Sequence, residues 1–276
     1  MPQTINTNVS SLNAQRNLNT SQSSLATSMQ RLSSGLRVNS AKDDAAGLAI
    51  AERMNAQVKG MNVAIRNAND GISMAQTAEG ALGQVSDMLQ RMRELAVQSM
   101  NATNGESDRA NLDAEFQQLA SEITRTIAGT QFNGLTILGA DAGTLTFQVG
   151  AGTTTNDSLN VTSVDLSADA SVGAVTGGAV TDVATATDAV NNIDTVLTTI
   201  NTERANWGAV QNRFEAVIGI LQVSAENQTA ARSRIMDADF AAETAALTRA
   251  QVLQQAGTAM LAQANQIPNS VLQLLR

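Results

Sequence analysis

The sequence predicts a mainly α-helical protein, in which long helices from both ends of the chain pair as antiparallel rods or a coiled coil, with a small β-hairpin region in the middle. Three observations lead to this fold class. Apolar residues recur at steps of three and four over long stretches near both termini, which is the period of one helix face. Hydrophobic residues make up 43% of the chain and aromatic residues only 2%, so the apolar content is aliphatic and suits closely packed helices. Alternation with the period of a strand occurs only near the middle.

The composition of the 276-residue chain excludes most enzyme chemistry. The chain has no Cys, no His and no Tyr, so thiol nucleophiles, imidazole bases, zinc fingers and iron–sulfur sites are ruled out. No phosphate loop, metal cluster or nucleophile–base pair is recognisable in the sequence. We therefore expect a protein that is not an enzyme, with no catalytic residue, no cofactor and no metal.

Charge and hydropathy limit the possible partners. The formal net charge is −8, and Lys42 and Lys59 are the only lysines, whereas nucleic-acid binding needs a concentrated basic face. No window approaches 18 consecutive apolar residues, so we expect no membrane span. The N-terminal segment lacks the basic region, apolar core and cleavage site of a secretory signal peptide, so we expect no cleaved signal peptide.

A first helix is predicted from Ile5, where apolar residues begin to recur by three and four. Residues 37–44 interrupt it with turn formers and charges, and Ser40 or Asp43 is placed to cap the next helix. Asp43 and Asp44 resemble a catalytic carboxylate pair, but nothing nearby would raise a pKa, so a capping and charge-pairing role is expected. The apolar seam of this first helix is expected to contain Leu25, Met29, Leu32 and Leu36.

The longest predicted element runs from Met54 to Ala96 and keeps its three-four rhythm throughout. About fifty residues at 1.5 Å each would make a helix of about 75 Å, longer than a compact single-core domain needs. Glycines inside a helix cost about 1 kcal/mol each relative to alanine. We interpret the glycines of this segment as places where a neighbouring helix comes close: Gly60, Gly71, Gly80 and Gly83.

The middle of the chain contains a turn, a second helix and the only expected β structure. The turn cluster 101–108 precedes a helical pattern over 112–127, which is short enough to fold back antiparallel. Alternating residues then predict a hairpin over 145–164. Residues 165–187 contain no large side chain and no charge pairing, so we expect a short surface loop there.

Helical periodicity returns over 193–235 and again over 246–274. Trp207 lies on the first of these stretches and is expected to anchor the core. The assembly seam of the last stretch is expected to contain Leu253, Met260, Ile267, Val271 and Leu274.

The terminal stripes need a partner. They carry Ala and Gly at many seam positions, with Asn and Gln elsewhere and few charges, so they are not self-sufficient helices. One interpretation is that the two termini pair within one monomer. The other is that they are poorly ordered in the free monomer and become buried against other copies. A head-to-tail contact that does not close would generate a helical filament.

Several strings at both ends of the chain are distinctive. At the N-terminal end they include Ile5–Asn8, Ser11–Leu18, Arg31–Arg37, Asn39–Leu48, Arg66–Ile72 and Ala75–Leu82. At the C-terminal end they include Ser233–Phe240, Arg249–Gly257, Gln266–Asn269 and Leu274–Arg276. With these strings the chain resembles bacterial flagellin. The resemblance covers about residues 1–150 and 190–276, and it implies a structural subunit that polymerises into the flagellar filament for motility.

The resemblance also implies a domain map and a route out of the cell. Residues 1–43 and 234–276 correspond to the terminal coiled coil of the inner tube. Residues 44–164 and 188–233 correspond to the core helical domain, and 165–187 replaces the outer domains of larger flagellins. Family members are exported unfolded through the flagellar secretion channel to an extracellular filament. The implied partners are other copies of the chain, an export chaperone, and the cap and hook-junction proteins.

One segment resembles the patch that a vertebrate Toll-like receptor recognises in flagellin. The matching residues are Arg91, Leu95, Gln98 and Glu115. The alternative is that these residues make subunit contacts within a filament, and both roles are compatible if the receptor meets released monomer.

Two other functions stay open at this point. One is a hook–filament junction protein, since such proteins share weaker versions of the flagellin-like strings at both ends. The match over Arg249–Arg276 is complete, which favours a filament subunit over a junction protein. A secreted coiled-coil adhesin would instead have terminal helices that are stably folded in the monomer.

Overall fold

The computed structural model describes the backbone of residues 7–274 and the side chains of residues 7–266. The chain forms two compact units. The terminal unit contains the residues up to Ala56 and those from Asn227, and the central unit contains Gln57–Glu226. The prediction of a mainly α-helical fold with a little β structure is confirmed. The helices are α1 (Val9–Ser34), α2 (Ala45–Ser99), α3 (Glu106–Gly129), α4 (Ala170–Thr176), α5 (Val183–Met236) and α6 (Phe240–Leu274), with one 3-10 turn at Thr155–Asp157.

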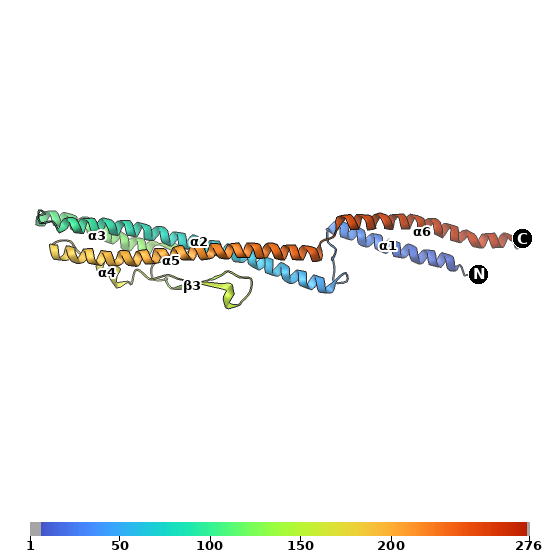
Figure 1. Cartoon of the computed structure of the whole chain (residues 1–276), viewed down its shortest axis with the longest axis horizontal. Helices are drawn as coiled ribbons and strands as arrows, with labels where there is room; N and C mark the ends of the chain where they lie inside the picture. The colour runs from blue at the N-terminus through green and yellow to red at the C-terminus, as the bar shows by residue number, and fades with distance from the viewer. Residues whose placement is uncertain (1–6, 275–276) are drawn as a thin grey trace. The chain divides into compact units, whose positions relative to one another are not determined.

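In the terminal unit, α1 and α6 lie side by side (Figure 1). The pairing is antiparallel, because the start of α1 meets the end of α6. Asn8 shows this directly. Its side chain accepts a hydrogen bond from the Ser11 backbone N–H at 3.1 Å and so caps α1, and its Nδ2 donates to the carbonyl of Ala264 at 2.8 Å. At the other end, α1 stops at Gly35, whose φ of 70° is the left-handed conformation that glycine adopts readily.

The two non-helical segments of the terminal unit, one between α1 and α2 and the other between α5 and α6, pair with each other. Leu36 and Asp237 form an isolated antiparallel bridge, and the Arg37 N–H donates to the carbonyl of Met236 at 2.7 Å. Val38 and Met236 are buried together in a small apolar cluster. Two segments far apart in sequence are therefore joined by backbone hydrogen bonds and by a miniature core.

The residue that caps α2 is Asp44, and our prediction of Ser40 or Asp43 was wrong. The Asp44 carboxylate accepts from the backbone N–H of Gly47 at 2.8 Å, which satisfies one unpaired donor of the first helical turn. Asp43 instead accepts hydrogen bonds from the backbone N–H groups of Asn39 and Ser40 within the linker.

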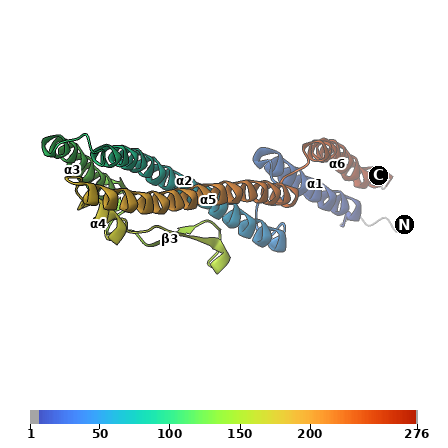
Figure 2. The ribbon, with the colours of Figure 1, turned by 60° about the vertical axis from the view of Figure 1, so that its left-hand side comes forward.

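In the central unit, α2, α3 and α5 lie alongside one another (Figures 1 and 2). Their facing sides form one apolar core, and Trp207 lies in it with 1% of its surface exposed, which confirms its predicted anchoring role. The largest fully buried side chains of this core include Phe116, Phe214, Leu82, Leu89, Met92 and Ile123.

The glycines of α2 fit the predicted close approach only in part. A Cβ added at Gly71 would lie 2.5 Å from the ring of Phe214 on α5, so a neighbouring helix does come close there. At Gly60 the close neighbour is Ala151, at 2.7 Å, which belongs to a loop. Gly80 and Gly83 have nothing within 4 Å among the described residues, and the prediction was wrong for both.

The predicted hairpin is confirmed as β3 (Thr144–Gln148) paired antiparallel with β4 (Ser158–Thr162). Alternate residues of β3 point inward, and the Phe147 ring meets Phe214 edge to face at a centroid distance of 5.3 Å. A second and smaller hairpin pairs β1 (Gln131–Phe132) with β2 (Leu135–Thr136). This smaller hairpin was not predicted from the sequence.

Residues 165–187 are not a simple surface loop, and that expectation was wrong. They contain α4 and the start of α5. Val180 is fully buried, and its backbone N–H donates to the carboxylate of Asp113 at 2.8 Å. The apolar side chains of the segment join the central core: Leu166, Val172, Val175 and Val180 are all buried.

Candidate functional site

The contact line between α1 and α6 is made of small side chains. The buried residues on this line are Ser11 and Ser28 of α1 and Ala250 and Ala264 of α6. Because these side chains are small, the two helix backbones can approach closely. At Gly257, for example, an added Cβ would lie only 3.3 Å from the side chain of Leu18. The pair therefore buries little apolar surface internally.

Several large apolar side chains of the pair face outward instead. They are exposed by half or more, with fractions of 63% for Val9, 50% for Leu12, 55% for Met29, 58% for Val252, 51% for Leu253 and 64% for Met260. We call these six residues the open apolar face. Large apolar side chains exposed in this number on a helix pair are typical of a protein interaction site.

The structure divides the predicted seam residues into groups. Met29, Leu253 and Met260 belong to the open apolar face, and Leu25 and Leu32 are half-buried. Leu36 is half-buried and packs against the linker cluster of Val38 and Met236, and its place in an assembly seam stays a prediction. The remaining predicted seam residues lie outside the described side chains: Ile267, Val271 and Leu274.

A groove of about 390 Å³ runs between the two helices beside the open apolar face. Leu18, Leu253 and Met260 supply its apolar wall, and Gly257 opens its floor. Its other side is polar, with Asn13, Asn17, Ser10 and Ser21. A helix with an apolar stripe and flanking amide groups is the kind of ligand that such a groove accommodates.

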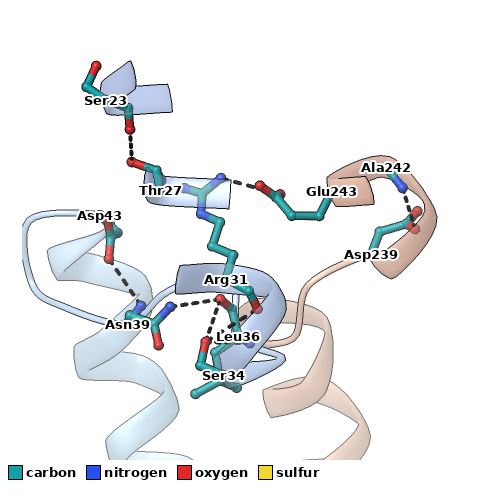
Figure 3. Close-up of polar contacts among 10 residues, drawn as sticks. All are labelled: Ser23, Thr27, Arg31, Ser34, Leu36, Asn39, Asp43, Asp239, Ala242 and Glu243. Atoms are coloured by element: carbon teal, nitrogen blue, oxygen red, sulfur yellow. Dashed lines mark hydrogen bonds and ion pairs between the residues drawn. The ribbon is translucent and has the colours of Figure 1, made fainter. Parts of the chain in front are cut away.

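Polar contacts fix the pair at its linker end (Figure 3). Arg31 of α1 points toward Glu243 of α6, and their charged groups are 3.8 Å apart. Asp239 accepts hydrogen bonds from the first backbone N–H groups of α6 and caps it. The Asp43 carboxylate accepts from the hydroxyl and N–H of Ser40 and from the N–H of Asn39, and these bonds hold the pKa of Asp43 below its usual value.

A second surface lies on the central unit, where α2 meets α3. The guanidinium of Arg91 bonds Glu115 of α3 at 2.8 Å and Glu94 at 3.0 Å. Hydrogen bonds to Glu115 and then to Glu94 raise the pKa of Arg91. Nearby, Arg93 pairs with Asp194 of α5 at 2.7 Å. The face is therefore a row of paired charges across three helices.

Leu95 does not belong to this surface. It is fully buried in the core of the central unit, so our prediction of it as a contact residue was wrong. Arg91, Gln98 and Glu115 are exposed and lie on the surface. A shallow groove of about 500 Å³ beside them is lined by Gln90, Arg93, Glu94, Val97 and Gln98.

The two adjacent carboxylates of the linker, Asp43 and Asp44, are both engaged in local hydrogen bonds. Their oxygens accept hydrogen bonds from backbone N–H groups, those of the linker for Asp43 and that of Gly47 in α2 for Asp44. Within the described part of the chain no three acidic side chains gather in a way that would hold a metal ion. None of the described helices is long and apolar enough to cross a bilayer.

These features define a helical structural protein whose terminal helix pair presents an open apolar face to a partner. Two family models match the chain. The bacterial flagellin N-terminal helical region matches residues 5–142, and the bacterial flagellin C-terminal helical region matches residues 190–275. The chain belongs to the bacterial flagellin family.

Individual relatives agree with this assignment. A flagellin of Halalkalibacterium halodurans is 50% identical over 272 residues, which are 99% of both chains. The flagellar filament 33 kDa core protein of Treponema phagedenis is 41% identical over 287 residues, again with 99% of both chains covered. The crystal structure of Bacillus cereus flagellin superposes with a TM-score of 0.50 and 32% identity, covering 60% of this chain and 94% of that one.

Proposed function

We propose that the chain is a structural subunit that polymerises into the extracellular flagellar filament for motility, after export in an unfolded state through the flagellar secretion channel. The observation that carries the proposal is the open apolar face on α1 and α6. Six large apolar side chains remain half exposed or more, although the two helices already pair with each other. Their burial against other copies would supply the free energy of association.

The domain roles follow from this. Residues 1–43 and 234–276 act as the inner, assembling segments, and 44–164 with 188–233 act as the core helical domain. The helix breaks at 35–44 and 237–239 lie near these boundaries and support them, although the two compact units divide within α2 and α5. Residues 165–187 occupy the place of the outer domains of larger family members, but their apolar side chains serve the core.

The role is structural, with no catalytic residue, cofactor or metal. The partners are other copies of the chain, an export chaperone, and the cap and hook-junction proteins. The support for this set is family membership together with the exposed apolar side chains of the terminal helices.

The test of assembly compares two double variants of α6. In Leu253→Ala/Met260→Ala the open apolar face loses two side chains that are 51% and 64% exposed. Each loses about 1 kcal/mol of the burial available on assembly, so the concentration needed for growth from filament seeds should rise about tenfold or more. The matched control is Gln251→Ala/Thr258→Ala, which changes exposed polar residues of the same helix.

The readout is polymer pelleted after seeding, with electron microscopy of the product. Deletion of 260–276 should abolish growth while the central unit stays helical by circular dichroism. Unchanged growth of the Leu253/Met260 variant, or stronger loss in the polar control, would contradict the assembly role of the open apolar face.

Recognition of released monomer by the vertebrate Toll-like receptor is a second role of the chain, and Arg91, Gln98 and Glu115 are the residues concerned. The supporting observation is that all three are exposed on one face of the central unit. Arg91→Glu should lower receptor signalling in a reporter-cell assay at equal protein concentration, because it reverses the charge facing Glu115 and the receptor. Lys59→Glu, which reverses a charge away from the patch, is the control, and equal signalling by both variants would count against the patch.

A further inference from the structure

The chain contains two Asn–Gly pairs in different local structures. Glycine lacks a side chain, so its backbone nitrogen can approach the preceding asparagine side chain more freely than that of any other residue. Asn133–Gly134 forms the two-residue turn between β1 and β2. Asn104–Gly105 lies directly before α3, with Gly105 in the N-cap position. The same chemistry can therefore be compared at two places in one molecule.

The pair in the hairpin turn is open to solvent. Asn133 and Gly134 are both exposed and have φ values of 51° and 83°, as a two-residue hairpin turn of the Asn–Gly type requires. Among the described residues, nothing bonds the Asn133 side-chain amide or the Gly134 N–H. A Cβ built on Gly134 would meet nothing within 4 Å, so no other part of the described chain packs against the turn at that position.

The hairpin that carries this turn is also small. Its strands, Gln131–Phe132 and Leu135–Thr136, contain two residues each. Short elements at the surface open locally at low free energy. Local opening allows Asn133 to leave its left-handed conformation, so that its side-chain carbon can meet the Gly134 nitrogen.

The second pair is held by hydrogen bonds on both reacting groups. The Asn104 Nδ2 donates to the carbonyl of Gln98 at 2.6 Å. The Gly105 N–H donates to the carboxylate of Asp108 at 3.1 Å. For the reaction to occur at Asn104, both of these hydrogen bonds would have to break. The first turn of α3 would have to open as well, because the Gly105 carbonyl accepts a hydrogen bond from the Arg109 N–H in that turn.

We propose that Asn133 is a site of spontaneous deamidation and isoaspartate formation, and that Asn104 is protected by its hydrogen bonds. The deprotonated backbone nitrogen of Gly134 attacks Cγ of Asn133, the new N–Cγ bond forms, and the Cγ–Nδ2 bond breaks with release of ammonia. Water then adds to either carbonyl of the resulting five-membered succinimide. Opening at one carbonyl gives aspartate and at the other gives isoaspartate, each with one added negative charge and with no change in oxidation state.

The reaction has a structural consequence at the turn. Isoaspartate carries the chain through its side-chain carbon, so the backbone between Phe132 and Leu135 gains one methylene group. A two-residue turn has no slack to absorb it, and we expect the β1–β2 pairing to be lost in modified molecules. Phe132 packs against the core of the central unit, so loss of the pairing would also disturb the packing of this side chain.

The experiment is incubation of the purified full chain at mildly alkaline pH and 37 °C, with peptide mapping by mass spectrometry and enzymatic methylation of isoaspartate. In the folded chain, isoaspartate should accumulate at position 133 about tenfold faster than at position 104, since two hydrogen bonds protect the latter. In urea the two rates should converge. Asp108→Ala should speed the reaction at Asn104 and leave Asn133 unchanged, and Asn133→Gln should remove the signal at 133. Equal rates in the folded chain, a faster reaction at 104, or no response to Asp108→Ala would each overturn the proposal.

Discussion

Replacement of Gly71 by alanine should destabilise the central unit through one contact. The added Cβ would lie 2.5 Å, 2.7 Å and 3.1 Å from three carbons of the Phe214 ring. That ring is fully buried and is held edge to face against Phe147, so it cannot move without disturbing the core. Overpacking of this kind costs about 1–3 kcal/mol, while alanine gains about 1 kcal/mol over glycine in a helix interior. The net expectation is a loss of about 1 kcal/mol.

Gly80 supplies the matched control further along the same helix. It is exposed, and a Cβ added there would have nothing within 4 Å, so Gly80→Ala should gain about 0.5–1 kcal/mol from helix propensity alone. The difference between the two variants cancels the propensity and isolates the contact with Phe214, at about 1–3 kcal/mol. The assay is urea unfolding followed by circular dichroism and by Trp207 fluorescence.

A further variant separates steric strain from other causes. Phe214→Leu removes the ring edge, so Gly71→Ala should cost less in that background than in the natural chain. Equal stability of Gly71→Ala and Gly80→Ala would refute the interpretation of Gly71 as a position fixed by close approach.

Three other predictions concern the terminal unit and the ends of the chain. The folded-state pKa of Asp43 is below its usual value of 3.8, so its stabilisation is complete above the unfolded pKa and is lost as pH falls through the folded pKa. Thermal melts on acidification should therefore change more for the natural chain than for Asp43→Asn, and parallel curves would contradict this. Limited proteolysis of free monomer should trim α1 and α6 first and leave about residues 50–230, whereas resistant ends would favour a coiled-coil adhesin. Arg31→Ala should loosen the linker end of the α1–α6 pair, seen as faster amide exchange near Glu243 than in a Lys42→Ala control.

The helices were predictable because their evidence is local and repeated. Successive stretches of α2, and of α5 as far as Phe214, present buried apolar residues to the core, so the period remains visible even where a single position departs from it. The hairpin β3–β4 was predictable for the same reason, since one side of each strand faces the core. The smaller hairpin was missed although its turn, Asn133–Gly134, is the strongest short hairpin signal in a sequence.

The surface assignment of Leu95 failed for a geometric reason. The three-four rhythm of this segment marks a single apolar stripe along the helix. In the structure α2 meets both α3 and α5, so its buried arc is wider and includes Leu95 as well. A sequence match fixes a position along the chain, but the direction of a side chain depends on how many helices surround it.

The linker of the terminal unit was beyond prediction from sequence pattern. Its bridge joins Leu36 to Asp237, and its cluster joins Val38 to Met236. Neither segment shows the apolar periodicity of a helix or a strand. Each hydrogen bond between them takes its donor from one segment and its acceptor from the other. Asp44 caps α2 in place of Asp43 because Asp43 accepts hydrogen bonds from Asn39 and Ser40 of its own segment.

The small-residue line between α1 and α6 has a consequence for register. Serine and alanine at Ser11, Ser28, Ala250 and Ala264 leave shallow ridges, so few interlocking side chains oppose a slide of one helix along the other. The position along the axis is then set by polar contacts near the two ends, the Asn8 bond to the Ala264 carbonyl and the Arg31–Glu243 ion pair. Because the contact line itself does not fix the axial register of α1 against α6, contacts with neighbouring molecules could shift that register.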